Sequence, residues 1–292
     1  MGKSISEKNV DRICYTVLTI CGIISILPII NVFATAFSGA TAVESGKVGL
    51  WPVDFTWESF KLLIEGTMAV RAMGNSIVIT LGGTIICMVM TTLAAYPLSK
   101  PYFVGNRIFT RLIVFTMLFS GGMIPTYIVI QKLGLIDTYW ALWLPSAVST
   151  YNMLVMRTFF TNIPKEIEEA AIIDGCGEWG LLFRIFIPLS KPVMATMVLF
   201  YGVAHWNTFM NAMLYINNPI KQNLSVLVQQ MIKSMNVLSS ELANANPQDL
   251  QAITSAGLRA AGVVVMVVPM LVIYPFLQKY FVKGVMLGSV KG

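Results

Sequence analysis

The stretch AMGNSIVITLGGTIICMVMTTLAAYPLS, residues 72–99, contains no Asp, Glu, Lys or Arg. A helix needs about 20 apolar residues to cross the hydrocarbon layer of a bilayer, which is roughly 30 Å thick. Backbone groups in lipid must find their hydrogen-bond partners within the segment, so a run of this kind must be helical. We therefore predict a membrane-spanning helix at residues 72–98.

Five further stretches of at least 19 residues also lack these four charged residue types. Together with the first they predict an all-α, polytopic membrane protein with six transmembrane helices. No linker or internal repeat divides the chain, so we expect a single transmembrane domain, residues 1–292. The predicted spans are residues 13–37, 72–98, 110–131, 138–158, 187–215 and 257–279.

Composition agrees with this prediction and excludes a nucleic-acid-binding protein. Only 12% of the residues are charged and 56% are hydrophobic, whereas soluble domains carry about 25% charged residues. The net charge is +6, but the basic residues lie beside the apolar runs, where they act as determinants of topology. The net positive charge therefore indicates membrane topology and not binding to nucleic acid.

The distribution of Lys and Arg predicts the orientation. Six spans put both termini on one side of the membrane, and if that side is the cytoplasm, 13 of the 20 basic residues lie inside. The apolar part of the first run exceeds the roughly 7–15 residues of a secretory signal, so we expect it to be retained as a span. Both termini are predicted to be cytoplasmic.

The most informative polar segment is the predicted cytoplasmic loop 163–188, IPKEIEEAAIIDGCGEWGLLFRIFIP. Pro164 suits a first helical turn, and Lys165–Asp174 is a run of good helix formers. Gly175 can adopt positive φ and end the helix, and Pro188 marks a bend into the fifth span. The loop therefore predicts a helix–turn–helix whose alanines let another protein approach closely.

A second polar segment, residues 217–256, is predicted to lie outside the cytoplasm. Residues 224–231 carry apolar side chains at the spacing of an amphipathic helix, and residues 239–251 are polar. Long loops of this kind are often functional, which makes the segment a candidate docking element.

The loop 163–188 resembles the cytoplasmic signature of binding-protein-dependent ABC importer permeases, written E-A-A, three residues, G, nine residues, I-x-L-P. Ile187 stands where the family has leucine. Pro52–Thr56, Asn75-Ser76, Trp206-Asn207 and the C-terminal tail look like the carbohydrate branch, similar to its smaller maltose-type permease. The matching signature positions are Glu169, Ala170, Ala171, Gly175, Ile185 and Pro188.

The resemblance implies the type I ABC importer permease fold and a role in coupling. The loop, including Glu168 and Asp174, would seat in a dimeric cytoplasmic ATPase. Lys283, Gly284 and Lys291 in the tail would contact the same ATPase. A second related permease, completing a heterodimer, and an extracytoplasmic sugar-binding protein would be the other partners, in a bacterial cytoplasmic (inner) membrane.

The implied function is import of a sugar, nearest to oligosaccharides, driven by ATP and Mg on the partner ATPase, with no cofactor bound by this chain. Polar groups within membrane spans often mark transport pathways, and aromatic rings with amides suit the hydroxyls and C–H faces of sugars. The alternative is that each of these side chains only forms hydrogen bonds to neighbouring helices. The pathway candidates are Tyr151, Asn152, Tyr201, His205, Asn207 and Asn211.

The sequence argues against two other classes of function. An ion-coupled secondary transporter is the main alternative, but such proteins tend to carry acids within spans, and all 14 acids lie outside the six runs. A membrane enzyme is disfavoured because the sequence has no P-loop, no nucleophile elbow and a single histidine, His205. We therefore assign no catalytic and no metal-binding residue.

Overall fold

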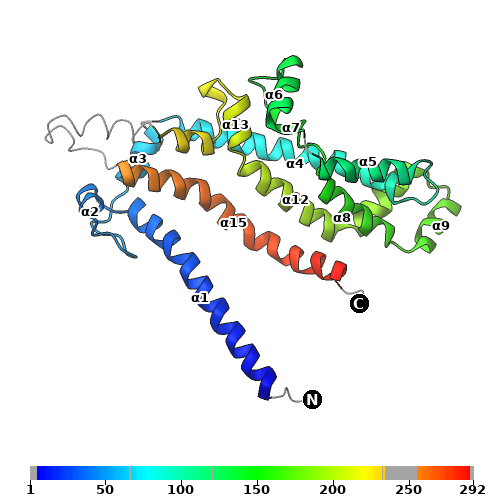
Figure 1. Cartoon of the computed structure of the whole chain (residues 1–292), viewed down its shortest axis with the longest axis horizontal. Helices are drawn as coiled ribbons and strands as arrows, with labels where there is room; N and C mark the ends of the chain where they lie inside the picture. The colour runs from blue at the N-terminus through cyan, green and yellow to red at the C-terminus, as the bar shows by residue number, and fades with distance from the viewer. Residues whose placement is uncertain (1–4, 66, 120, 232, 234–254, 290–292) are drawn as a thin grey trace. The chain divides into compact units, whose positions relative to one another are not determined.

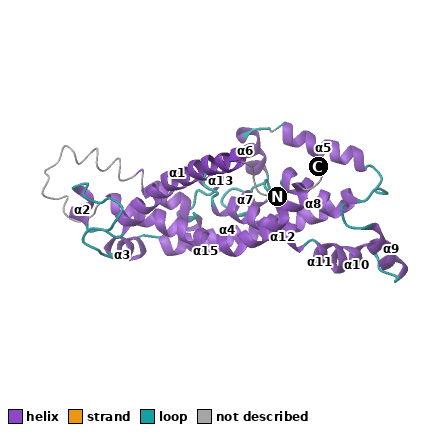
Figure 2. Ribbon diagram, turned by 90° about the horizontal axis from the view of Figure 1, so that it is seen from below, coloured by secondary structure: helices purple, strands orange, loops and turns teal. Residues whose placement is uncertain are grey.

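The computed structural model describes residues 5–65, 67–119, 121–231, 233 and 255–289. Throughout these ranges the chain consists of helices joined by loops, without a strand (Figure 2). The chain divides into two compact units, Met1–Val70 with Leu227–Pro269 and Arg71–Val226 with Met270–Gly292. Each unit is described by itself.

The first unit contains α1 (Ile5–Ala36), α2 (Ala40–Glu44), α3 (Glu58–Glu65) and the beginning of α15 (Ser255–Ser289). A small core joins α1, α3 and α15, in which Ala36 and Leu63 pack with Ala261 and Val264. At the start of α3 the backbone N–H of Glu58 donates to Thr56 Oγ1 at 3.2 Å. Residues 224–231, at the boundary between the units, are helical as the amphipathic spacing predicts.

The second unit holds most of the long helix α4, which runs through its centre (Figure 1). One core cluster packs Cys87, Tyr96, Met153, Phe186 and Met197 together. A second surrounds Ile79, Ala141, Tyr215 and Val226. α4 extends from Ala69 to Ser99. This unit also contains α5 (Asn106–Leu118), α6 (Met123–Lys132), α7 (Trp140–Trp143), α8 (Thr150–Thr161), α9 (Lys165–Ile173), α10 (Glu178–Gly180), a π-helix (Leu181–Phe186), α11 (Ile187–Leu189), α12 (Lys191–Trp206), α13 (Met210–Tyr215) and a 3₁₀-helix (Pro219–Lys221).

The predicted spans differ in how continuous they are. Three stretches, Val10–Ala36, Ala69–Ser99 and Ala256–Pro275, are single helices long and apolar enough to cross a membrane. Two bent pairs raise the number to five: α5 with α6 at 114°, and Glu178–Leu189 with α12 at 82°. Gly121 and Gly122 lie directly before α6, and Pro188 lies just before the bend that leads into α12. Both bends therefore occur near residues that disfavour helix.

The predicted fourth span, 138–158, contains two short helices instead of one long one. α7 ends at Trp143, Pro145 lies in the break, and α8 begins at Thr150. Proline supplies no N–H for a continuing helix, and Ser149 caps α8 by accepting from the N–H of Asn152 at 3.4 Å. The apolar run predicted the length of this segment but not its interruption.

Candidate functional sites: the 163–188 loop and a polar pocket

The loop 163–188 forms the helix that its sequence predicts. α9 runs from Lys165 to Ile173, and Gly175 follows with φ +79°. The N–H of Gly175 donates to the carbonyl of Ile172, and the N–H of Cys176 donates to that of Ala171, both at 2.9 Å. This is a Schellman motif, in which a glycine in the left-handed region closes the helix.

One side of α9 and its continuation is apolar and exposed. Ile173 is 85% exposed, and Ile172, Trp179 and Phe183 are also largely exposed. Glu169, Ala170, Asp174 and Gly175 are exposed on the same short segment, whereas Ala171 packs into the core. We call Glu169, Ile172 and Ile173 the tip of the loop. An exposed apolar tip beside charged groups has the composition of an interaction surface.

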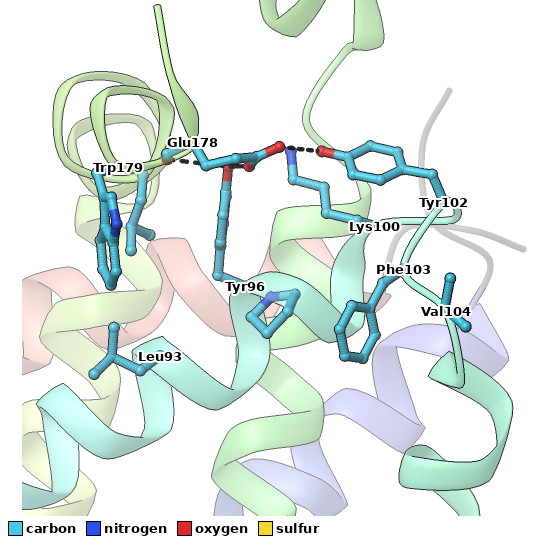
Figure 3. A pocket seen from close by; sticks show the side chains of 10 residues that line it. Leu93, Tyr96, Lys100, Tyr102, Phe103, Val104, Glu178 and Trp179 are labelled. Carbon is cyan, nitrogen blue, oxygen red and sulfur yellow. Dashed lines mark hydrogen bonds between the residues drawn. The ribbon is translucent and has the colours of Figure 1, made fainter.

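The loop is also fastened to the end of α4. Lys100, which is only 3% exposed, forms an ion pair with Glu168 at 2.5 Å. The hydroxyl of Tyr96 donates to Glu178 Oε2 at 2.6 Å. The hydroxyl of Tyr102 is 3.0 Å from Glu178 Oε1 and 3.2 Å from Glu168 Oε1, so its single proton is shared between the two carboxylates. Figure 3 shows Glu178 between the two tyrosines.

The electrostatics of Tyr102 keep it a hydrogen-bond donor. Although more than half of the residue is exposed, desolvation of its hydroxyl, followed by the hydrogen bond and charge of Glu178, raises its pKa above the ordinary value. Both neighbouring carboxylates favour the neutral phenol. The hydroxyl therefore stays protonated at physiological pH and continues to donate.

A cavity of about 610 Å³ opens beside this cluster (Figure 3). Its walls are mostly apolar, with Leu93, Phe103 and Trp179 around the polar groups of Lys100 and Glu178. Sequence reasoning missed Tyr96, Lys100, Tyr102 and Glu178, because their partners are 66 to 82 residues distant. The one available signal was a lysine directly after a long apolar run.

A second cavity, of about 400 Å³, lies where two segments leave helical geometry. The α7–α8 break contributes Ser146 and Ser149, the first turn of α8 contributes Asn152, and the α12–α13 segment contributes Thr208 and Asn211. Phe200 adds an aromatic ring. We call this cavity the polar pocket. None of the residues that line it is Asp, Glu, Lys or Arg.

Four of the six predicted pathway residues line the polar pocket: Asn152, Tyr201, His205 and Asn211. Tyr151 and Asn207 are exposed and do not line it. Tyr201 is held by internal bonds, since its hydroxyl is 2.6 Å from Thr91 Oγ1 and accepts from the N–H of Ser149 at 3.1 Å. His205 Nε2 lies 3.4 Å from Cys87 Sγ. The side chains of Tyr201 and His205 are therefore bonded within the protein and form part of the pocket wall.

Asn152 differs from these wall residues. It is only 6% exposed, yet its side-chain amide has no hydrogen-bond partner among the described residues. Its polar atoms are not sealed from solvent as those of Thr84 and Ser190 are, so the amide faces the open space of the pocket. Its amide lines the pocket and is available to a ligand that offers hydroxyl groups.

The other residues predicted to contact the ATPase, and the predicted extracytoplasmic loop, are described only in part by the structure. Ile185 packs against the core around Tyr96, and Pro188 is exposed next to the 82° bend. Lys283 and Gly284 lie within α15, of which only the backbone is described at these positions, and Lys291 lies outside the described residues. Residues 239–251 of the predicted extracytoplasmic loop are likewise outside them.

Apolar helices broken around a polar pocket, with an exposed helical loop, are typical of helical membrane transport proteins. Residues 83–287 match the family described as binding-protein-dependent transport system inner membrane component, and the chain belongs to this family. It is accordingly a permease subunit of an ABC transport system and not an enzyme.

Individual relatives agree over nearly the whole chain. The polygalacturonan/rhamnogalacturonan transport system permease protein YtcP of Bacillus subtilis (strain 168) is 41% identical, over 97% of this chain and 98% of its own. Protein LplC of the same organism is 42% identical, over 93% and 91%. A crystal structure of a bacterial ABC transporter involved in the import of the acidic polysaccharide alginate superposes with a TM-score of 0.86 at 29% identity, covering 96% of this chain and 99% of that one.

Proposed function

We propose that this chain forms half of the translocation pathway of an ATP-driven sugar importer, with oligosaccharides as its substrate class. The observation that carries the proposal is the loop 163–188, whose helix α9 is closed by Gly175 and presents an exposed tip. The sequence has no P-loop of its own, so the tip fits a contact with a separate ATPase. A carbohydrate substrate is supported by two similar proteins, whose names refer to the polysaccharides polygalacturonan and alginate.

In this proposal the tip seats in a cleft of a dimeric cytoplasmic ATPase that binds ATP and Mg. A second related permease completes the pathway, and a sugar-binding protein outside the cytoplasm delivers the substrate. Six spans with both termini in the cytoplasm give the required sidedness, with the loop 163–188 inside and residues 217–256 outside. The tail with Lys283, Gly284 and Lys291 adds a further ATPase contact in a bacterial inner membrane.

The polar pocket is proposed as part of the sugar pathway. An uncharged wall with amides, hydroxyls and the ring of Phe200 offers hydrogen bonds and an apolar face, the two features that a sugar ring presents. Asn152 and Asn211 are the proposed hydrogen-bonding groups, with Tyr201 and His205 as the supporting wall. Tyr151 and Asn207 are proposed to line the pathway beyond the pocket.

The test is reconstitution of the chain with its partner permease, ATPase and binding protein in liposomes. Uptake of labelled trigalacturonate and of labelled maltotriose is measured with and without ATP. We expect ATP-dependent uptake of at least one of them, and its loss in Glu169→Lys and Gly175→Pro although both variants still insert into the membrane. Normal uptake in both variants, or uptake by this chain alone driven by an ion gradient, would contradict the proposal.

A further inference from the structure

The two glutamates at the centre of α9 are neighbours in sequence but differ in environment. Glu169 is exposed and has no ion pair within the described residues, while the side chain of Glu168 is only 17% exposed and is paired with Lys100. A second carboxylate, Glu178, is turned toward α4 in the same way. Two acidic side chains of the loop, Glu168 and Glu178, therefore make contacts within this chain.

Lys100 is the anchor of these contacts. Its ammonium group lies 3.9 Å from the centre of the Phe186 ring and 4.8 Å from that of Tyr96, in addition to the ion pair with Glu168. An ammonium group that is almost fully buried is strongly destabilising unless it is paired. Separation of Glu168 from Lys100 is therefore disfavoured, and the pair acts as a stiff connection between α9 and the end of α4.

The tyrosine hydroxyls add a second connection. Tyr96 and Tyr102 donate to the two oxygens of Glu178, so this carboxylate is bonded from both sides (Figure 3). Hydrogen bonds to a charged acceptor are roughly twice as strong as bonds between neutral groups. We call Tyr96, Lys100, Tyr102, Glu168 and Glu178 the clamp.

The end of α4 to which the clamp is attached is itself held firmly. Arg157 of α8 donates through Nε to the carbonyl of Leu98 at 2.7 Å. Asn106 at the start of α5 donates to the carbonyls of Leu98 and Lys100, both at 2.9 Å. These donors satisfy the carbonyls that a helix leaves unpaired at its C-terminus. A displacement of α9 would thus be transferred to α4 and, through these bonds, to α8 and α5.

We propose that the clamp is the transmission element of this permease, which makes α9 and the end of α4 move as one rigid body. Its five residues are positioning residues: the tip of the loop takes up the motion of the ATPase, and the clamp carries it into the helices around the polar pocket. The proposal rests on the coupling function proposed above. It also assigns Glu168 to an internal contact, in contrast to Glu169 at the ATPase.

A distance measurement tests the rigid connection directly. Spin labels are attached to p-acetylphenylalanine introduced at Glu166, exposed on α9, and at Val104, which is 90% exposed after α4, so that the four native cysteines remain. The distance is measured by pulsed electron paramagnetic resonance in the assembled complex, without nucleotide and trapped with ATP and vanadate. We expect the same distance in both states for the wild type and a broader, shifted distribution for the double variant Tyr96→Phe/Tyr102→Phe. A distance that changes in the wild type would overturn the proposal.

A functional measurement complements it. In the reconstituted complex, Tyr96→Phe/Tyr102→Phe keeps both rings and removes the bonds to Glu178, so ATP hydrolysis should persist while sugar imported per ATP falls at least about fivefold. Tyr15→Phe, in which the tyrosine is exposed on α1, is the matched control and should leave this ratio unchanged. An unchanged ratio in the double variant, or a parallel fall of hydrolysis and uptake, would overturn the proposal.

The adjacent glutamates separate this proposal from the proposed function. Glu168→Gln should lower the sugar imported per ATP, whereas Glu169→Gln should lower the amount of ATPase that co-purifies. If the wild-type chain captures no ATPase, the proposed function fails. If it captures ATPase and imports sugar, but Glu168→Gln imports as much sugar per ATP as the wild type, only the clamp fails.

Discussion

The loop 163–188 and the polar pocket belong to the same unit but differ in how the sequence forms them and in the side chains that they present. The loop is one contiguous stretch of sequence, with exposed apolar and acidic side chains at its tip. The pocket is assembled from two distant segments around helix breaks, and its lining contains no Asp, Glu, Lys or Arg. Exposed mixed surfaces favour contact with another protein, whereas buried uncharged polar cavities favour small ligands rich in hydroxyl groups. The comparison predicts that changes in the two regions affect different measurable steps.

The largest effect that would sharpen this difference is expected at the tip. Ile173→Asp should reduce capture of the ATPase, and with it ATP-dependent uptake, by about 30-fold or more, as for a hot-spot residue worth about 2 kcal/mol or more. The fold should be unaffected because Ile173 is already exposed to solvent. Co-purification of the ATPase and uptake in liposomes are the measurements. Val104→Asp, the same type of change at another exposed residue, should leave both unchanged, and equal losses in the two variants would contradict the assignment.

A smaller effect is expected at the wall of the pocket. A Cβ at Gly83 would lie 2.6 Å from atoms of the His205 ring, so Gly83→Ala should force this ring to move and destabilise the chain by about 1–3 kcal/mol. Thermal unfolding in detergent and sugar uptake are measured together. Gly74→Ala in the same helix is the control, because a Cβ there meets no atom within 4 Å. If Gly74→Ala were as destabilising as Gly83→Ala, the close packing of α4 against His205 would not be the cause.

The free amide in the pocket gives the next prediction. Asn152→Ala should raise the KM for uptake by about 2–10-fold, which corresponds to one hydrogen bond of about 0.5–1.5 kcal/mol, while ATPase capture stays unchanged. Asn162→Ala, at the exposed C-terminus of the same helix α8, should change neither quantity. Loss of ATPase capture in Asn152→Ala would remove the distinction between pocket and loop.

The fold was predictable from the sequence where it depends on one-dimensional patterns. Length and absence of charge predicted long helices at α1, α4 and α15, because a membrane admits few other structures for such runs. The same pattern could not predict the bend between α5 and α6 or the break at residues 144–149, whereas Pro188 did predict the bend before α12. These breaks depend on how the freed backbone groups find partners in the folded chain, which hydropathy does not encode.

The sites divide in the same way. α9 and Gly175 were predictable because the capping glycine, the proline and the apolar spacing all lie within 26 residues, 163–188. Polar side chains in apolar runs predicted four lining residues of the pocket but also Tyr151 and Asn207, since the pattern does not say which face of a helix turns inward. The clamp was not predictable, because a tyrosine or lysine at a helix end acquires its role only from an acid that folding brings near.

The smallest effect on stability is expected at Ser149. This residue is both the N-cap of α8, a feature set by the local sequence, and part of the lining of the polar pocket. Its hydroxyl accepts from the N–H of Asn152 at 3.4 Å, a long bond, so Ser149→Ala should cost about 0.5–1 kcal/mol of stability, the lower part of the range for helix caps. Ser149→Asp restores a capping acceptor but introduces a charge into a pocket whose lining has no Asp, Glu, Lys or Arg. Thermal unfolding should therefore recover in Ser149→Asp while uptake falls below that of Ser149→Ala. If uptake recovered along with stability, the hydroxyl would act only as a cap, and the uncharged character of the pocket would be irrelevant to transport.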